Sequence, residues 1–403
     1  MTDIISVTFS DGRTLYSLYF IPIPNGFAML EHGGKVPQAL RMAKVLVGLS
    51  GGVDSSVAAA LLVEQGQEVA TGYMKNWVND EGLPGDCPWQ QDIEDARAVS
   101  SALGIEFRVI DLIEVYRHRI VDYLIDGYRS GITPNPDVWC NREMKFGVFL
   151  DYALEQGFEF VATGHYARKR SLADGTAVIL RGADPNKDQS YFLSLLTQRQ
   201  ARHALFPTGE MLKPEVRATA RRFGLAVAEK KDSQGICFLG HVKMSDFLRH
   251  YLPDTVGQIV DTTGRVMGEH RGLHLYTIGQ RKGHGVASPR EGMAYVVVGK
   301  NHAKNQLVIG WDSVESPGLY AKRCVIGSVS SLGEPLDTLR RVEAQPRYRS
   351  RAEAAELAPR EDGKLELIFR KSQRAIAPGQ VCAFYEGGQL LGGGVFEEIV
   401  DRG

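Results

Sequence analysis

Lys44-Val-Leu-Val-Gly-Leu-Ser50-Gly-Gly-Val-Asp-Ser55-Ser is the stretch that decides the fold of this chain. An apolar, β-branched run stops at Ser50-Gly51-Gly52, and the helix formers of 57–63 follow, so the pattern predicts a buried strand, a tight loop and a helix. The two glycines allow the backbone to approach an anion, and a helix that begins near Ser55 offers free N–H groups and the positive end of its dipole. The stretch therefore predicts a phosphate site.

The loop differs from a Walker A motif, because no lysine follows its glycines at the position that contacts the β- and γ-phosphates. Ser50-Gly-Gly-Val-Asp-Ser55 instead resembles the PP-loop of enzymes that cleave ATP between the α- and β-phosphates and adenylate a carbonyl oxygen. That resemblance implies that the loop holds the departing pyrophosphate and that Asp54 helps to position Mg²⁺. The alternative is a glycine-rich turn between a strand and a helix that binds no ligand.

The composition is that of an ordinary globular protein, with 43% apolar and 24% charged residues in 403 positions. This length is sufficient for two or three domains. The sequence contains no apolar run of about 18 residues, so we expect no membrane-spanning helix. The net charge of −1 gives no general attraction to nucleic acid, so an RNA contact must come from local basic patches.

The cysteines indicate a reducing compartment. The chain has five cysteines, which are widely spaced and form no C-x-x-C pair: Cys87, Cys140, Cys237, Cys324 and Cys382. This spacing argues against a disulfide scaffold and against a structural zinc, and we expect a cytoplasmic protein.

Residues 1–42 show neither the pattern of a signal peptide nor that of a transit peptide. We expect an accessory extension, with Met42 as the functional start because it directly precedes the first strand of the alternating pattern.

From residue 43 to about 200 the pattern alternates between strand and helix. Strands are predicted at 44–49, 68–74, 106–111, 158–163 and 177–181, and helices at 55–65, 90–103, 113–128 and 144–156. Such alternation predicts a mainly parallel sheet with helices on both faces, whose ligands bind at the carboxyl ends of the strands. We therefore expect Ser50–Ser55, Met74–Trp77 and Thr163–Tyr166 to converge.

The later sequence predicts two further domains. Residues 200–250 look helical and basic, and after Pro253 short strands and glycine turns follow. We predict an α/β domain of the PP-loop type over 43–251, a small, mainly β central domain over 252–312 and a C-terminal β-barrel over 313–403.

Thr133-Pro-Asn-Pro-Asp-Val-Trp-Cys140-Asn is the second informative stretch. Its prolines predict an extended loop that presents Asp137 and Cys140 just before a helix that starts near 142–145. A thiol beside a helix N-terminus and near Lys145 should be an activated nucleophile, and the alternative is a buried structural cysteine.

Lys230-Lys-Asp-Ser-Gln-Gly-Ile-Cys237-Phe is the third such stretch. Cys237 follows a polar loop with two lysines, an environment that suits a thiolate or a persulfide. Two activated thiols, Cys140 and Cys237, suggest redox or sulfur-transfer chemistry by thiol exchange. The other three cysteines lack activating neighbours, so we interpret them as structural.

Taken together, these motifs resemble the bacterial tRNA-specific 2-thiouridylase family, in order from about Ala43 to the C-terminus. The motifs that carry the resemblance are Ser50–Ser55, Met74–Trp77, Thr133–Asn141 with Lys145-Phe146, Thr163–Tyr166, Asn186–Phe192, Asp232–Phe238, Thr277–Gly283 and Pro378–Gln380. Trp139 departs from the family pattern, which has a smaller apolar residue there.

The resemblance implies an ATP-dependent replacement of the C2 oxygen of the wobble uridine of tRNA by sulfur. ATP would be a substrate, with Mg²⁺ and no permanently bound cofactor, on Gly48, Leu49, Ser50, Gly51, Gly52, Val53, Asp54, Ser55, Met74 and Gly164. Cys237 would carry a persulfide received from a sulfur-relay protein, Cys140 would attack it to leave a transient Cys140–Cys237 disulfide, and Asp137 would act as acid or base. Whether the persulfide or a released hydrosulfide attacks the base stays open.

The family also implies the partner. A monomer would bind tRNAs of the Lys, Glu and Gln acceptors and no membrane, through Asn135, Pro136, Asp137, His165, Lys187, Asp188, Gln189, Arg347, Tyr348 and Gln380. The arginine-rich run 340–351 and Tyr348 suit RNA binding, although a solvated charged face is the alternative for that run, and a structural histidine is the alternative for His165.

Two other functions remain compatible with parts of the pattern. Another PP-loop adenylating ligase would use ammonia or an amine and would need neither Cys140 nor Cys237. A non-catalytic tRNA-binding or sulfur-carrier protein would form no AMP.

Overall fold

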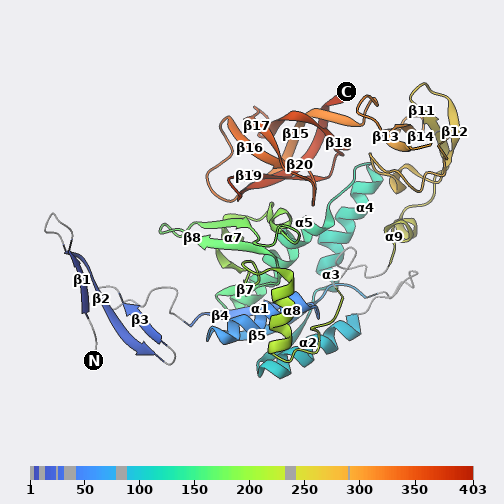
Figure 1. The fold of residues 1–403 in the computed structure, drawn as a ribbon. Helices are drawn as coiled ribbons and strands as arrows, with labels where there is room; N and C mark the ends of the chain where they lie inside the picture. Colours follow the sequence, from blue (N-terminus) through green and yellow to red (C-terminus); the bar gives the residue numbers. More distant parts are fainter. Residues whose placement is uncertain are drawn as a thin grey trace.

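The computed structural model describes residues 4–8, 14–23, 26–30, 42–78, 89–231, 242–288 and 291–402. The first three segments are the strands β1 (Ile4–Thr8), β2 (Thr14–Ile23) and β3 (Gly26–Leu30), which form an antiparallel sheet of their own. From Met42 onward the chain builds an α/β domain and then two β domains (Figure 1).

A five-stranded parallel sheet is the centre of the α/β domain. Its strands are β4 (Lys44–Gly48), β5 (Glu68–Lys75), β6 (Glu106–Asp111), β7 (Phe160–Ala162) and β10 (Ala204–Leu205), in the order β10-β7-β4-β5-β6. In the central strand β4, Leu46 belongs to the apolar core on one face of the sheet and Val45 and Val47 to the core on the other. Both faces are therefore buried, as a parallel sheet requires.

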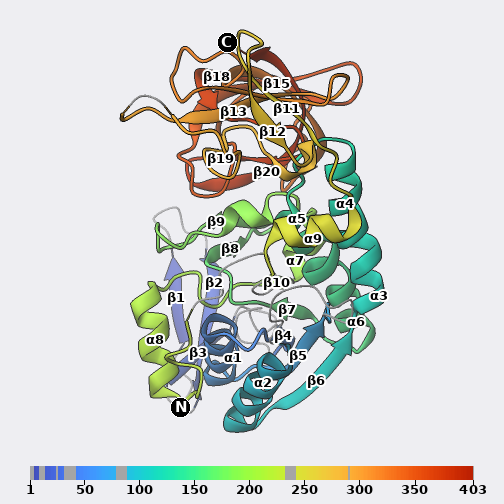
Figure 2. The ribbon, with the colours of Figure 1, turned by 90° about the vertical axis from the view of Figure 1, so that its right-hand side faces the viewer.

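Helices cover both faces of this sheet (Figure 2). One apolar core contains residues of α1 (Val53–Glu64), α2 (Trp89–Leu103) and α8 (Lys213–Arg222). The other contains residues of α3 (Ile113–Tyr116), α4 (Asp122–Arg129), α5 (Pro136–Cys140), α6 (Phe149–Glu155), α7 (Gln198–His203) and α9 (Met244–Tyr251). The predicted parallel sheet with helices on both faces is confirmed.

The helical segment predicted at 113–128 is present over 113–129, and the one predicted at 144–156 begins earlier, at Pro136. A π-helical turn η2 (Arg117–Val121) joins α3 to α4, and a second one, η3 (Asn141–Val148), joins α5 to α6. Such turns are rare within helices, so the sequence pattern predicts regular α-helix there.

The strand predicted at 177–181 is present as β9 (Ala177–Arg181), but its expected place in the parallel sheet is wrong. It pairs antiparallel with β8 (Ala167–Ser171) and, through Ile179 and Leu180, with the last strand β20 (Gln389–Arg402). An apolar alternation reports a buried strand face and says nothing of the partner strand, so the sequence could not exclude this pairing.

The central domain is a four-stranded sheet in the order β12-β11-β14-β13, preceded and interrupted by loops. Its strands are β11 (Gly257–Asp261), β12 (Val266–His270), β13 (Tyr295–Asn301) and β14 (Gln306–Trp311), with the short helix η5 (Leu273–Leu275) between β12 and β13. The predicted mainly β character is confirmed.

The C-terminal domain is a closed barrel. Its strands are β15 (Tyr320–Ser331), β16 (Arg340–Gln345), β17 (Glu353–Pro359), β18 (Leu365–Arg374), β19 (Val381–Glu386) and β20. They follow the order β15-β18-β17-β16-β19-β20, and β15 pairs with β20 to close the ring. Phe369, Phe384 and Phe396 fill its interior. Among the described residues, the helices are too short or too polar to cross a bilayer.

Candidate active site

The loop between β4 and α1 forms a tight, preorganised turn. Ser50 N–H donates to Ser55 Oγ at 3.2 Å, and the Ser56 hydroxyl donates to the Gly52 carbonyl at 2.8 Å. Gly51 has a φ of +71°, and a Cβ there would lie 2.6 Å from the carbonyl oxygen of Asp92 in α2. Only glycine fits this position, and the turn leads directly into the N-terminus of α1, where an anion is favoured.

The other two predicted stretches lie beside this loop. A Cβ on Gly48 would be 3.3 Å from Met74 Cε, and a Cβ on Gly164 would be 2.5 Å from the backbone nitrogen of Ser55. The Tyr166 hydroxyl donates to Asp54 Oδ1 at 2.7 Å. The structure therefore brings Met74, Gly164 and the loop together at the carboxyl edge of the parallel sheet, where ligands of such sheets bind.

Lys213 is a residue of this site that sequence reasoning missed. Its ammonium donates to Asp54 Oδ1 at 2.7 Å, its side chain is only 12% exposed, and its backbone N–H donates to Asp184 at 3.0 Å. The ammonium that contacts Asp54 thus comes from the first residue of α8, 159 positions later in the chain. In the sequence, Lys213-Pro-Glu predicts the start of a helix, but nothing there indicates that Lys213 contacts Asp54.

Asn135 starts α5, the helix that carries Asp137 and Cys140. Its side-chain oxygen accepts from Val138 N–H at 3.2 Å, and Pro136 occupies the first turn. The expectation that the helix starts near 142–145 is wrong, because this cap and proline start it at 136. Cys140 lies within a continuous helical segment and is 1% exposed, so a helix N-terminus does not activate its thiol.

Cys237 and the rest of Asp232–Phe238 lie outside the described residues, as does Cys87. The distance from Cys140 to Cys237 is therefore not defined. Cys324 and Cys382 are fully buried in the barrel core, and burial raises the pKa of the Cys382 thiol well above its usual value. In the described part of the chain no three His, Cys, Asp or Glu side chains gather to hold a metal ion.

His165 is buried next to the loop between β4 and α1, residues 49–52, which we call the nucleotide loop after the ligand that its sequence predicts. Its Nδ1 lies 2.7 Å from the Thr163 hydroxyl, and the rings of Phe146 and Phe206 pack around it. Burial, and then the charge of Lys145, hold the pKa of His165 well below 6.5. The imidazole is therefore neutral at physiological pH.

Asp188 and Gln189 use their side chains within the protein. Asp188 accepts from the backbone N–H groups of Gly182 and Ser190, both at 3.0 Å, and from Arg181 at 2.9 Å. Gln189 Oε1 accepts from Tyr166 N–H at 3.1 Å. These contacts shape the short helix η4 (Ser190–Leu193) and the position of Tyr166 beside the nucleotide loop.

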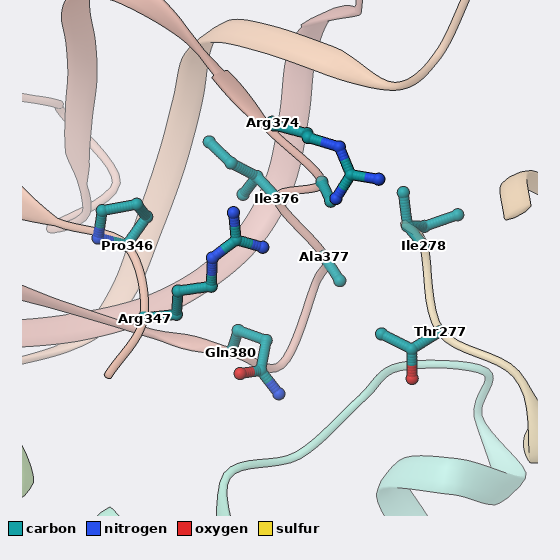
Figure 3. A pocket seen from close by; sticks show the side chains of 9 residues that line it. Thr277, Ile278, Pro346, Arg347, Arg374, Ile376, Ala377 and Gln380 are labelled. Atoms are coloured by element: carbon teal, nitrogen blue, oxygen red, sulfur yellow. The ribbon is translucent and has the colours of Figure 1, made fainter. Parts of the chain in front are cut away.

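Arg347 lies in a pocket between the central domain and the barrel (Figure 3). The cavity volume is about 170 Å³, and its lining residues are Thr277, Ile278, Pro346, Arg347, Arg374, Ala375, Ile376, Ala377 and Gln380. Burial, followed by the neighbouring Arg374, lowers the pKa of Arg347. Arg374 is paired with Asp312 at 2.9 Å.

Other members of the arginine-rich run are engaged on the barrel surface. Arg340 pairs with Glu386 at 2.6 Å and Arg341 with Glu356 at 3.4 Å. The Tyr348 ring packs on Phe192, with centroids 4.3 Å apart. The run is thus divided between paired strand residues and the loop that begins at Pro346.

Trp139, the departure from the family pattern, packs against α4. Its ring stacks on Tyr123 at 5.0 Å with an interplanar angle of 14°, and the Arg142 guanidinium lies over it at 5.1 Å. The stack joins α4 to α5 beside Cys140.

Three family models match successive parts of the chain. They are described as a tRNA methyl transferase HUP domain over residues 43–241, a tRNA methyl transferase PRC-barrel domain over 245–311 and an aminomethyltransferase beta-barrel domain over 321–396.

Two relatives carry the same name. The tRNA-specific 2-thiouridylase MnmA of Akkermansia muciniphila is 67% identical over 89% of this chain and 99% of its own length. The protein of that name from Pseudomonas syringae pv. syringae is 44% identical over 90% of this chain and 96% of its own length. Among solved structures, a 4-thiouridine synthetase in complex with RNA and ATP is 15% identical over 60% of this chain and 59% of that one, with a TM-score of 0.32.

Proposed function

The chain belongs to the family of tRNA-specific 2-thiouridylases, and from this we infer that it is an ATP-dependent sulfurtransferase that converts the wobble uridine of tRNA to 2-thiouridine. Within the structure, the observation that carries the proposal is the nucleotide loop. Asp54 is held there by Tyr166 and Lys213, at the sheet edge that also presents Met74 and Gly164.

ATP would bind with its phosphates on Gly48–Ser55 and its nucleoside beside Met74 and Gly164. The C2 oxygen of the uridine is a poor leaving group until it is adenylated, and then it departs as part of AMP. Lys213 would face the pyrophosphate, whose charge develops as the bond breaks. The Asp54 carboxylate, 32% exposed and next to the loop, suits Mg²⁺, which prefers a carboxylate, phosphate oxygens and water.

Sulfur would arrive as a persulfide on Cys237 from a sulfur-relay protein. Attack of the Cys140 thiolate on the inner sulfur forms a Cys140–Cys237 disulfide and releases the outer sulfur as hydrosulfide, which takes up the electron pair that the two thiols lose. An external dithiol then reduces the disulfide. Alternatively, the persulfide attacks the base directly and the same disulfide then forms. Both routes consume one persulfide sulfur and oxidise the two thiols to one disulfide. Asp137, one helical turn before Cys140, would move the protons.

tRNA would lie across all three domains. Arg347, Tyr348 and Lys187 would contact the RNA, while Asn135–Asp137 would meet the extruded base. His165, Asp188, Gln189 and Gln380 complete the surface implied by the family, with side chains that also bond within the protein. We propose a cytoplasmic monomer acting on the Lys, Glu and Gln acceptors.

We also propose the domain boundaries expected from the sequence. These are a catalytic domain over 43–251, a central domain over 252–312 and a tRNA-contacting barrel over 313–403, with 1–42 as an extension. Limited proteolysis followed by mass spectrometry would test them, because domain boundaries are cleaved first.

AMP release tests the function most directly. With ATP, Mg²⁺, a sulfur donor and tRNA lacking 2-thiouridine, we expect AMP and thiolated tRNA in equal amounts, and no thiolation by Cys140→Ser. A ligase that uses an amine would be indifferent to Cys140→Ser, and a carrier protein would form no AMP. AMP release at the same rate without tRNA would contradict the proposal.

A further inference from the structure

The loop between α4 and α5 lies beside both β domains (Figure 1). The C-terminus of α4 ends in a glycine turn, in which Gly131 N–H donates to the Tyr128 carbonyl and Ile132 N–H to the Gly127 carbonyl, both at 3.1 Å. Thr133 and Pro134 then lead to Asn135, the cap of α5. The contacts of Thr133 and Pro134 therefore set the position in space of the N-terminus of α5, whose first residue is fixed by Asn135 and Pro136.

The barrel holds this loop through Pro378-Gly379-Gln380. Gln380 Nε2 donates to the Thr133 carbonyl at 2.8 Å and reaches the Pro134 carbonyl at 3.4 Å, while Thr133 N–H donates to the Pro378 carbonyl at 2.8 Å. Both neighbours of the amide nitrogen are carbonyl oxygens, which only accept hydrogen bonds. The NH₂ group of Gln380, and not its oxygen, must therefore face them. Gly379 has a φ of +88°, and a Cβ there would lie 2.8 Å from the Thr133 oxygen.

A second contact ties the cap of α5 to the same domain. The Asn135 side-chain amide donates to the Tyr191 hydroxyl at 3.3 Å, and this hydroxyl donates to the Val381 carbonyl of β19 at 2.9 Å. Tyr191 is almost completely buried, and burial raises the pKa of its phenol well above 10. The hydroxyl therefore keeps its proton and the chain of bonds persists over the working pH range.

The central domain also contacts this loop. The Thr277 and Thr133 hydroxyls lie 3.3 Å apart, and Lys300 Nζ is 3.5 Å from the Gly131 carbonyl at the end of α4. A Cβ on Gly131 would lie 2.3 Å from the His302 ring, so this ring packs directly on the glycine. A cation near the C-terminus of a helix is favourable, which stabilises this docking.

We infer that Gln380 is a positioning residue, which fixes the Thr133-Pro134 segment against the barrel and thereby sets the position of Asp137 and Cys140 in α5. The effect of this role on catalysis rests on the proposed function of Cys140. The contacts that define the role are independent of that function. The two β domains are then part of the active-site framework as well as an RNA-binding surface.

Alkylation of Cys140 in the RNA-free protein tests the inference. Cys140 is 1% exposed, so iodoacetamide reaches it only when the loop and α5 move. Loss of one hydrogen bond to the loop in Gln380→Ala should raise the labelling rate by about three- to tenfold. Gln380→Glu should raise it further, because it places a carboxylate against two carbonyl oxygens. Peptide mass spectrometry assigns the label to Cys140.

Gln373→Ala is the matched control, since Gln373 belongs to the same barrel and its amide bonds only to the Lys371 carbonyl among the described contacts. It should label at the wild-type rate, and circular dichroism should show all variants folded. Equal labelling of the wild type, Gln380→Ala and Gln380→Glu would overturn the inference, whatever the protein does with tRNA.

Steady-state thiolation gives an independent second readout. A positioning role predicts that Gln380→Ala lowers kcat by about tenfold, in addition to any rise in the KM for tRNA that its place on the RNA-binding surface causes. A residue that only contacts RNA would raise the KM and leave kcat and the labelling of Cys140 unchanged, and that pattern would also overturn the inference. Absence of thiolation in the wild type would refute the proposed function alone, because labelling needs neither ATP nor tRNA.

Discussion

Lys213→Met removes the cation that pairs with Asp54, in the first turn of α1, among the residues that the structure describes. The ammonium lies 2.7 Å from Asp54 Oδ1 and projects from the first residue of α8. Methionine keeps the length and the apolar stem of the side chain and takes away only the charge and its hydrogen bonds. The change therefore tests whether this lysine replaces the one that the loop lacks.

The expected loss of activity follows from the strength of a hydrogen bond to a charged group. Hydrogen bonds to charged groups contribute about 1.5–3 kcal/mol, which corresponds to about a ten- to 150-fold change in an equilibrium or a rate. If Lys213 faces the pyrophosphate, kcat/KM for ATP should fall by this factor. Folding should suffer little, by about 1 kcal/mol or less, because Asp54 is 32% exposed and keeps the Tyr166 hydroxyl.

The assay is AMP release at varied ATP and saturating tRNA, with urea unfolding of the same samples. Arg222→Met is the control, since Arg222 ends the same helix and pairs with Glu64 on the surface, and it should leave kcat/KM for ATP unchanged. A Lys213→Met enzyme with wild-type kcat/KM would refute the reasoning. So would a loss of activity that merely follows a large loss of stability.

Three further predictions concern other parts of the molecule. Tyr191→Phe leaves the buried Val381 carbonyl without its donor, so the free energy of unfolding in urea should fall by about 1–3 kcal/mol, and an unchanged midpoint would show that water replaces the hydroxyl. His165 is neutral when folded and has a pKa well below the 6.5 expected when unfolded, so its contribution to stability is complete above about pH 6.5 and decreases as the pH falls below that value. The urea midpoint should therefore fall less between pH 7.5 and 5.5 in His165→Asn than in the wild type, and parallel curves would contradict this assignment. Arg347→Gln should weaken tRNA binding and reduce the slope of log K against log salt by about 1, whereas an unchanged slope would exclude a phosphate contact.

Local patterns were sufficient for much of the α/β domain. The strand, glycine turn and helix at 44–64 are encoded by adjacent residues, because β-branched residues, glycines and alanines each restrict the backbone where they stand. The start of α5 is encoded locally as well, in Asn135 and Pro136, although two prolines so close together also fit the extended loop that we predict from the sequence.

Contacts between distant segments could not be predicted in the same way. The place of β9 beside β20 depends on which strand offers a free edge, and the pairing leaves no trace in the alternation of either strand. The tie between Gln380 and Thr133 joins residues 247 positions apart. A hydrogen bond between a side chain and a backbone carbonyl puts no requirement on the residue type that supplies the carbonyl.

The sequence by itself determined the parallel sheet, the nucleotide loop and the residues that resemble the tRNA-specific 2-thiouridylase family, because all of these depend on short runs of neighbouring residues. Only the tertiary structure showed that Lys213 reaches Asp54 and that two β domains hold the start of α5. The physical reason is the range of the forces. Backbone preferences act between neighbours along the chain, whereas an ion pair or a hydrogen bond acts between any two groups that packing brings within about 3 Å.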